Sequence, residues 1–264
     1  MKSVVFLGAG RITGALLAGL HRAKYRGPVI VHDRHPQKLL QLKKLYGAGV
    51  ERNLHRAVKQ AGLLVIAVRP DSVASLLHEI GKVDHHLTAV SLAAGIPLAN
   101  LRSALGPRVR WARAMPSSAC RSGRGLTALA FDRNFPAATR REVKALFARI
   151  GAVLEIPQRK FDAFTVTYSC SHGYHALATL ADEARKLGLD RQTSLTAAAH
   201  ALADGIMAWR EGSISLKALL GEAATPGGIA AATHKAVRRA GYHRAVAAGL
   251  AAGVKQARKN ARRT

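Results

Sequence analysis

Short, uninterrupted runs of apolar residues alternate with stretches of helical periodicity through the first half of the chain. The runs at residues 4–7, 29–32, 63–68 and 88–93 predict buried strands, and weaker runs at 110–114, 128–131 and 152–156 predict further strands. Between them, helical spacing is found from Leu16 onward, over residues 36–46 and over residues 137–150. Continuous apolar strands separated by helices are typical of a parallel sheet that is covered on both faces.

The second half of the chain has a different pattern, which begins near residue 160. It is rich in alanine, leucine and histidine, and it predicts helices over residues 164–187, 191–212, 214–220 and 226–239 and from Tyr242 onward. Alanine-rich helices pack closely, so we expect an all-helical domain that pairs with another copy of itself. The predicted domains are residues 1–158 and residues 159–264, and the second one ends in a basic tail.

The residues after the first apolar run indicate the chemistry of the first domain. Gly8 and Gly10 follow the run directly, and a helical pattern begins immediately after them. Strand, glycine turn and helix in this order are the context of a dinucleotide-binding loop, in which a helix N-terminus faces a pyrophosphate. The motif is imperfect, because the third glycine of G-x-G-x-x-G is Thr13 and Gly14 comes one residue late. A plain glycine turn is the alternative, but the order of elements favours an α/β domain with a Rossmann-type doubly wound sheet.

The end of the second strand bears on the choice of cofactor. Asp33 would accept hydrogen bonds from an adenosine ribose, whereas Arg34 would bind a 2′-phosphate, so the two residues indicate different cofactors. His32, His35 and Lys38 add positive charge nearby. We therefore expect NADP, with NAD as the alternative.

Two further loops follow predicted strands at the edge where ligands bind in such sheets. Val68-Arg69-Pro70 ends the third strand sharply, and the small residues Ala93-Ala94-Gly95 after the fourth would let a flat ring approach the backbone. The predicted cofactor-binding residues are Gly8, Gly10, Arg11, Ile12, Asp33, Arg34, Val68, Arg69, Pro70, Ala93, Ala94 and Gly95.

The composition narrows the class of protein. Of the 264 residues 48% are hydrophobic, which is ample for a core, and no apolar stretch is long enough to predict a membrane-spanning helix. Because the first strand starts at the N-terminus and Cys120 and Cys170 have no metal-site spacing, we expect a reduced, cytoplasmic protein without a signal peptide or a metal site.

The charge of the chain is strongly positive. Forty-one Lys and Arg residues against fifteen Asp and Glu give a formal net charge of +26, which attracts polyanions. The positive residues are spread along the chain and no nucleic-acid-binding motif accompanies them. We therefore favour a solvated basic surface over a specific nucleic-acid interface.

Two segments further along the chain add to the pattern. Arg113-Ala-Met-Pro-Ser-Ser118 follows a predicted strand, and Thr225-Pro-Gly-Gly-Ile229 interrupts the helical domain. Thr225 and Pro226 suit the start of a helix, and the two glycines leave backbone N–H groups open, so that start could hold a carboxylate. An ordinary helix–helix corner is the alternative.

In this order, the segments resemble the pyrroline-5-carboxylate reductase family over nearly the whole chain. The family motifs are a glycine fingerprint, a strand ending near an Arg, V-K-P, S-x-A-A-G, R-x-M-P-N, D-A-x-T-A-x-S-G-S-G-P-A-Y and S-P-G-G-T-T. The matching segments are Gly8-Ala-Gly10, Asp33-Arg34, Val68-Arg69-Pro70, Ser91-Leu-Ala-Ala-Gly95, Arg113-Ala-Met-Pro116, Asp162-Ala-Phe-Thr165 with Tyr174, and Thr225-Pro-Gly-Gly228. The resemblance implies an N-terminal dinucleotide domain, a C-terminal all-α dimerisation domain and dimers able to assemble further. It also implies hydride transfer from a reduced nicotinamide to a cyclic imine acid.

The chain departs from the family mostly on the substrate side. The Asn after Met-Pro is Ser117, the segment before Tyr174 is Ser169-Cys-Ser-His-Gly173, and the two threonines after Pro-Gly-Gly are Ile229 and Ala230. In the family, the second of these threonines is placed to hydrogen-bond the imine nitrogen, which Ala230 cannot do. The family holds the substrate carboxylate largely by backbone N–H groups at this helix start, and that part can persist here.

The predicted function is therefore an NADP-dependent reductase of pyrroline-5-carboxylate or a close analogue, as in proline biosynthesis. Hydride transfer to an iminium needs little more than orientation and one proton donor. The predicted catalytic residues are His172 and Tyr174, with a structural or surface histidine as the alternative for His172. The predicted substrate-binding residues are Met115, Pro116, Ser117, Thr225, Gly227, Gly228 and Ile229.

Two other functions stay open at this point. Ala230 and the altered segment before Tyr174 motivate a non-catalytic or regulatory homologue that binds a nucleotide or a metabolite. The positive charge motivates a weaker third hypothesis, a protein that binds nucleic acid electrostatically.

Overall fold

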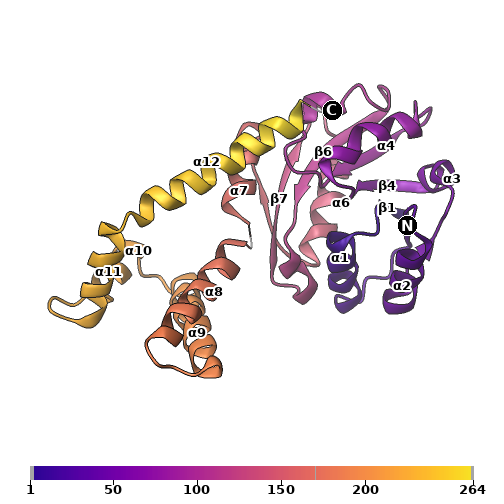
Figure 1. Cartoon of the computed structure of the whole chain (residues 1–264). Helices are drawn as coiled ribbons and strands as arrows, with labels where there is room; N and C mark the ends of the chain where they lie inside the picture. The colour runs from indigo at the N-terminus through magenta and orange to yellow at the C-terminus, as the bar shows by residue number, and fades with distance from the viewer. Residues whose placement is uncertain (1–2, 170, 263–264) are drawn as a thin grey trace. The chain divides into compact units, whose positions relative to one another are not determined.

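The computed structural model describes residues 3–169 and 171–262 and divides into two compact units (Figure 1). The first consists of Met1–Tyr168 and Ala252–Thr264, and the second of Ser169–Ala251. The domain boundary that we predict at residue 158 lies inside the first unit, shortly before helix α7 (Phe161–Thr167). The first unit also includes the end of the chain, which the sequence pattern assigns to the helical domain.

The first unit is built on an eight-stranded sheet with the strand order β3-β2-β1-β4-β5-β6-β7-β8. Neighbouring strands are parallel except for the antiparallel pair β6 and β7. The connection between these two holds a short 3₁₀ helix, Ser118–Ser122, and is too short for the crossover that a parallel pair needs. The strands are β1 (Ser3–Leu7), β2 (Val29–His32), β3 (Gly49–Val50), β4 (Ala61–Ile66), β5 (Leu87–Ser91), β6 (Val109–Met115), β7 (Gly125–Phe131) and β8 (Gly151–Glu155).

Helices cover both faces of this sheet, as its continuous apolar strands predict. Val4 and Phe6 of β1 pack on one face, against α1, α2 and α6, while Val5 and Leu7 pack on the other, against α3, α4 and α5. In Figure 1, α4 lies above β1 and β4, and α1 and α2 lie below. The helices are α1 (Arg11–Arg22), α2 (Pro36–Tyr46), α3 (Leu54–Lys59), α4 (Val73–Ile80), α5 (Leu98–Leu101) and α6 (Ala137–Ala148). The predicted doubly wound α/β architecture is confirmed.

Two predicted helices differ from the structure. The helix predicted over residues 164–187 is wrong as a single element, because α7 ends before Tyr168 and α8 (Ser171–Lys186) follows. The helix predicted over residues 226–239 begins later, as α11 (Ile229–Arg239), because Gly227 adopts a left-handed φ of +78° that a helix cannot contain. Hydrophobic periodicity does not predict β3 or α3, because both are too short to show a period.

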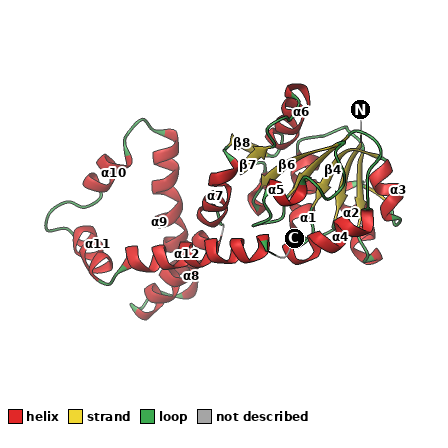
Figure 2. Ribbon diagram, turned by 90° about the horizontal axis from the view of Figure 1, so that it is seen from above, coloured by secondary structure: helices red, strands yellow, loops and turns green. Residues whose placement is uncertain are grey.

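The second unit is entirely helical in its described residues (Figure 2). It contains α8, α9 (Arg191–Glu211), α10 (Leu216–Glu222), α11 and the first part of α12 (Tyr242–Ala261). Of the described residues 169 and 171–251, only Ala181, Ser194 and Ala198 are buried. Large apolar side chains instead stand in solvent, among them Leu187, Trp209 and Ile229. A single chain therefore leaves this unit without a closed core.

None of the helices in residues 3–169 and 171–262 combines the length and the apolar character that crossing a bilayer requires.

Candidate functional site

The predicted cofactor residues of the first unit lie at one edge of the sheet. The loops after β1, β2, β4 and β5 all leave the carboxyl ends of parallel strands. The strand order places β1 directly beside β4, so the direction in which the chain winds reverses between these two strands. Ligands of doubly wound sheets bind at this reversal, where neighbouring loops diverge.

The loop after β1 has an open path to the start of α1. Gly8 has a φ of +111°, and a Cβ there would lie 2.8 Å from the carbonyl oxygen of Ala67, so glycine is required by the chain itself. A Cβ at Gly10, in contrast, would meet no described atom within 4 Å. Gly10 is the N-cap of α1, and no side chain among the described residues caps this helix. The first turn of α1 therefore presents backbone N–H groups toward open space, which suits an anion such as a pyrophosphate.

Thr13, where the fingerprint has its third glycine, closes this loop. Its side chain is fully buried and its hydroxyl donates a 2.6 Å hydrogen bond to the carbonyl oxygen of Gly8. The close packing that a third glycine permits is found instead at Gly19, where a Cβ would lie 2.3 Å from the carbonyl oxygen of Cys120. A Cβ at Gly14 would make only ordinary contact with Leu42. The departure at Thr13 is thus accommodated within the loop.

Asp33 holds the same loop from the end of β2. Its Oδ2 accepts a 2.7 Å hydrogen bond from the Ala9 N–H, and its Oδ1 accepts the His35 N–H and lies 2.8 Å from the His35 ring Nδ1. Burial by itself raises the pKa of Asp33, but the hydrogen bonds from Ala9 and His35 outweigh it, so the pKa lies below its usual value. The carboxylate that we predicted to bind cofactor is thus already committed to Ala9 and His35.

Arg34, the next residue, lies at the surface. Its side chain is 70% exposed and forms a hydrogen-bonded ion pair with Glu79 of α4. A guanidinium in this place can offer its remaining N–H groups to a phosphate group that reaches the edge beside β2. Sequence reasoning missed Glu79, since nothing in the local pattern marks an exposed glutamate on α4 as a neighbour of β2.

The loop after β4 contacts the glycine loop that follows β1. The side chain of Val68 lies beside Gly8, with its Cγ1 3.2 Å from where a Cβ on Gly8 would stand, so two predicted cofactor loops are in contact. Arg69 is largely exposed and lies near Asp71, and Pro70 starts a 3₁₀ turn.

Gly95, after β5, is glycine for a reason that differs from our expectation of an approaching ring. Its φ is +81°, and a Cβ there would lie 2.6 Å from the carbonyl oxygen of Ala257 in α12. Nearby, Asn260 of the same helix donates to the carbonyl of Ala94. The small residues at 93–95 therefore receive a helix of the same unit, and their binding to a cofactor stays a prediction.

Ser117, after β6, contacts an unexpected partner. Its hydroxyl lies 2.9 Å from the phenol oxygen of Tyr168, which also accepts the Leu126 N–H at 2.7 Å. Ser117 is largely buried and further accepts a bond from the Ala119 N–H. Tyr168 follows α7 at the position of the Ser in the family motif D-A-x-T-A-x-S. Its contact with Ser117 was missed, although a tyrosine at a serine position is the sign that could have suggested it.

An ion pair joins two of the family motifs in this chain, because Arg113 of R-x-M-P contacts Asp162 of D-A-x-T. Its side chain is fully buried, its Nη2 lies 3.3 Å from Asp162 Oδ1, and its guanidinium carbon lies 4.1 Å above the Phe161 ring. Burial lowers the pKa of Arg113, and Asp162 offsets part of this effect. The pair fixes α7 to the strand that leads to Met115 and Pro116.

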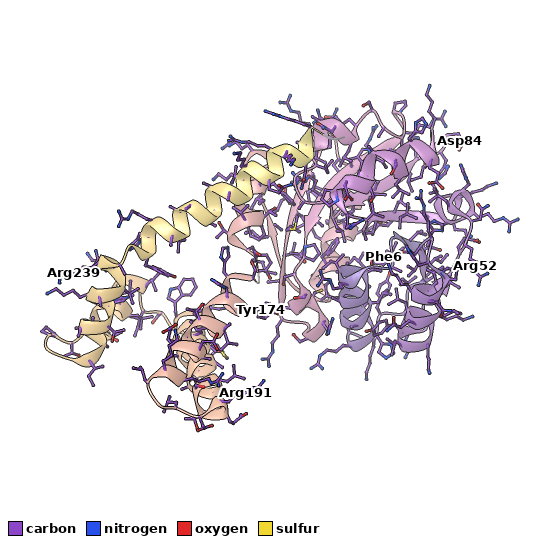
Figure 3. All side chains as sticks on the ribbon, viewed as in Figure 1. Phe6, Arg52, Asp84, Tyr174, Arg191 and Arg239 are labelled. Atoms are coloured by element: carbon purple, nitrogen blue, oxygen red, sulfur yellow. The ribbon has the colours of Figure 1, made fainter. Side chains whose placement is uncertain are left out.

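The predicted catalytic residues lie in the second unit, in the first turns of α8. His172 and Tyr174 are both exposed, and Figure 3 shows Tyr174 on this helix. Two residues apart, they do not share a helix face. The structure does not place the two units relative to each other, so their catalytic role stays a prediction.

The substrate-binding residues predicted in the second unit form a turn before α11. The Gly228 N–H donates to the Thr225 carbonyl, and Gly228, not Thr225, is the N-cap of the helix. Ile229 is 89% exposed, so nothing in the described chain covers this helix start. Open backbone N–H groups are present there, and the binding of a carboxylate stays a prediction.

Comparison with protein families matches both parts of the chain. Residues 3–95 match the model described as NADP oxidoreductase coenzyme F420-dependent. Residues 158–260 match the model described as pyrroline-5-carboxylate reductase dimerisation. The second match covers the helices that leave large apolar side chains exposed.

Curated relatives and solved structures agree with these matches. A pyrroline-5-carboxylate reductase of Thermus thermophilus is 35% identical over 76% of this chain and 77% of its own length. One from Mycobacterium tuberculosis is 29% identical over 96% of this chain and 94% of its own. The structures of the Streptococcus pyogenes enzyme, with a TM-score of 0.89, and of the Plasmodium falciparum enzyme with NADP bound, with a TM-score of 0.87, share the fold at 19% identity. They cover 97% and 98% of this chain, respectively, and 98% of their own. The chain belongs to the pyrroline-5-carboxylate reductase family.

Proposed function

We propose that this protein is an NADPH-dependent reductase that transfers hydride to pyrroline-5-carboxylate or a close analogue, as in proline biosynthesis. The observation that carries the proposal is the uncapped start of α1 at Gly10, beside the point where the sheet reverses its winding. In a member of this family, that opening fits the pyrophosphate of a dinucleotide. Bound NADPH would supply the hydride, and the protein would supply binding and orientation.

Different residues of the first unit would hold different parts of the cofactor. The N–H groups of Arg11 and Ile12 in the first turn of α1 would bind the pyrophosphate, and Arg34 would bind the 2′-phosphate. Asp33 keeps the glycine loop in its place through Ala9. Val68 and Pro70 would line the side of the site formed by the loop after β4.

On the substrate side, Ser117 and Tyr168 together have one hydrogen-bond donor to offer. The two hydroxyls share one hydrogen bond, so one of their two O–H groups remains to donate elsewhere. We place this donor near Met115 and Pro116, facing the substrate. His172 or Tyr174 would then supply the proton, and the N–H groups around Gly228 would bind the carboxylate.

The test is an assay of NADPH oxidation by pyrroline-5-carboxylate, run together with direct measurement of NADPH binding. Turnover supports the proposal. Absence of both binding and turnover would overturn it, and tight binding without turnover of this or related cyclic imines would indicate the regulatory alternative. That alternative is favoured by Ala230, which lacks the hydroxyl of the family threonine, and by the altered segment 169–173.

The exposed apolar side chains of the second unit support a homodimer formed through its helices. Light scattering of the purified protein tests this: a mass near the single-chain value of 28.1 kDa contradicts it. We further propose a cytoplasmic location, without a specific nucleic-acid partner.

A further inference from the structure

The acid at the end of β2 is already used to hold the glycine loop. Both carboxylate oxygens of Asp33 bond within the chain, to Ala9 and to His35, and the side chain is 13% exposed. A carboxylate used in this way has little acceptor capacity left for a ribose hydroxyl, and turning toward one would release the glycine loop. The contacts of Asp33 with the loop therefore account for this acid without assigning it to the ribose.

A different carboxylate stands beside Arg34. Glu79 belongs to α4, whose residues Val73, Leu76, Leu77 and Ile80 are buried against the sheet. This packing fixes the helix, so Glu79 is held on its exposed side, where it pairs with Arg34 from β2, forty-five residues earlier in the chain. The Glu79 side chain is 43% exposed, more than that of Asp33, and its oxygens are accessible to a ligand.

The opposite charges of Arg34 and Glu79 determine which kind of ribose each residue favours. A 2′-phosphate must share the Arg34 guanidinium with Glu79 and lie close to a carboxylate of the same sign. A ribose with a free 2′-hydroxyl carries no charge there, and it can donate a hydrogen bond to the carboxylate. Glu79 therefore opposes binding of the cofactor with a 2′-phosphate and does not oppose binding of the cofactor without one.

We propose that Glu79 is a specificity-determining positioning residue: by holding Arg34, it sets how strongly the site prefers a 2′-phosphorylated adenosine over an unphosphorylated one. The inference rests on the proposed cofactor site and goes further than the assignment of NADP. In this arrangement Arg34 produces the preference for the 2′-phosphate, and Glu79 limits that preference.

The test measures binding of two fragments that differ only in the 2′-phosphate, adenosine 2′,5′-bisphosphate and adenosine 5′-monophosphate, to the full-length protein by calorimetry. Glu79→Gln is expected to tighten the bisphosphate about fivefold at low salt, the upper range for an exposed ion pair. The monophosphate should bind the same or slightly more weakly. The gain should shrink as the salt concentration rises, because exposed charges are screened.

Two further variants separate this role from a general effect of charge or fold. Glu142→Gln removes the same charge from α6, which joins β7 and β8 at the other edge of the sheet, and should leave both affinities unchanged. Arg34→Gln should abolish the preference for the bisphosphate. In that background Glu79→Gln should tighten the bisphosphate by clearly less than about fivefold, because only the direct repulsion between carboxylate and phosphate remains.

The outcomes distinguish the inference from the proposed function. If the wild-type protein binds neither fragment, the cofactor site itself is wrong. If it binds both but Glu79→Gln leaves their affinity ratio unchanged, or changes it no more than Glu142→Gln does, the role of Glu79 is refuted while the cofactor site stands.

Discussion

The phenol oxygen of Tyr168 lies 2.9 Å from the Ser117 hydroxyl oxygen, so two departures from the family motifs contact each other. Ser117 replaces an Asn and is the smaller residue, whereas Tyr168 replaces a Ser and is the larger one. The Tyr168 ring extends from the end of α7, packs against Phe164 and brings its hydroxyl to Ser117. The two replacements are therefore coupled through one hydrogen bond.

Tyr168→Phe is expected to destabilise the fold by about 1–2 kcal/mol, because the Leu126 N–H and the Ser117 hydroxyl both lose a partner. If the pair also donates to the substrate, the variant should raise the KM for the imine while the affinity for NADPH stays unchanged. Chemical denaturation and steady-state kinetics measure the two effects.

Tyr242→Phe is the matched control for this variant. Tyr242 is exposed on α12, so loss of its hydroxyl should change neither stability nor KM. A Tyr168→Phe protein that behaves like Tyr242→Phe would show that the contact with Ser117 contributes nothing measurable.

Thr13→Val removes the buried hydroxyl that bonds to the Gly8 carbonyl and keeps the size of the side chain. The Gly8 carbonyl then lacks its bond, so we expect a loss of about 1–3 kcal/mol in the free energy of unfolding and weaker NADPH binding. Thr13→Ser keeps the hydroxyl and should retain the affinity for NADPH. Equal affinities for Thr13→Val and the wild type would mean that the bond does not shape the loop.

Asp33→Asn tests the carboxylate that holds the glycine loop. Because its pKa is lower in the folded than in the unfolded protein, ionised Asp33 stabilises the fold at pH values above the unfolded pKa. This stabilisation is lost as the pH falls through the folded pKa. The difference in unfolding free energy between wild type and Asp33→Asn should therefore be largest near neutral pH and shrink below a pH of about 4.

Denaturation curves at several pH values measure this difference. Asp182→Asn, an exposed carboxyl of α8, serves as the control. A difference between wild type and Asp33→Asn that does not vary with pH would contradict the proposed role of the carboxylate charge.

Local patterns explain which parts of the fold were predictable. The strand Val29–His32 and the helix Pro36–Tyr46 match their predicted ranges, since a continuous apolar run and a helical period are properties of adjacent residues. The bond from Ala9 to Asp33 spans twenty-four positions, and no period along the chain encodes such a contact. The same holds for Glu79 beside Arg34.

The candidate site, too, was predictable only where local patterns define it. The loops were predictable because they follow strands, and the family motifs gave their order. What each side chain does inside a loop was not predictable: Thr13 closes the turn, and Asp33 bonds to the loop. Both roles depend on where neighbouring elements lie, which becomes known only when the sheet is assembled.

Gly95→Ala tests how the end of the chain is held against the sheet. At Gly95, a Cβ would approach the Ala257 carbonyl oxygen to 2.6 Å and Ala257 Cα to 2.9 Å, so α12 would have to move, in addition to the strain of a φ of +81°. Gly47→Ala is the matched control, because Gly47 also has a left-handed φ, +67°, but a Cβ there meets no described atom within 4 Å. The control should cost about 1 kcal/mol of backbone strain and Gly95→Ala at least about 1 kcal/mol more, from displaced packing. Denaturation measures both variants, and hydrogen exchange of α12 should rise in Gly95→Ala alone. Equal costs, with unchanged exchange in α12, would mean that this helix is not held against Gly95 in solution.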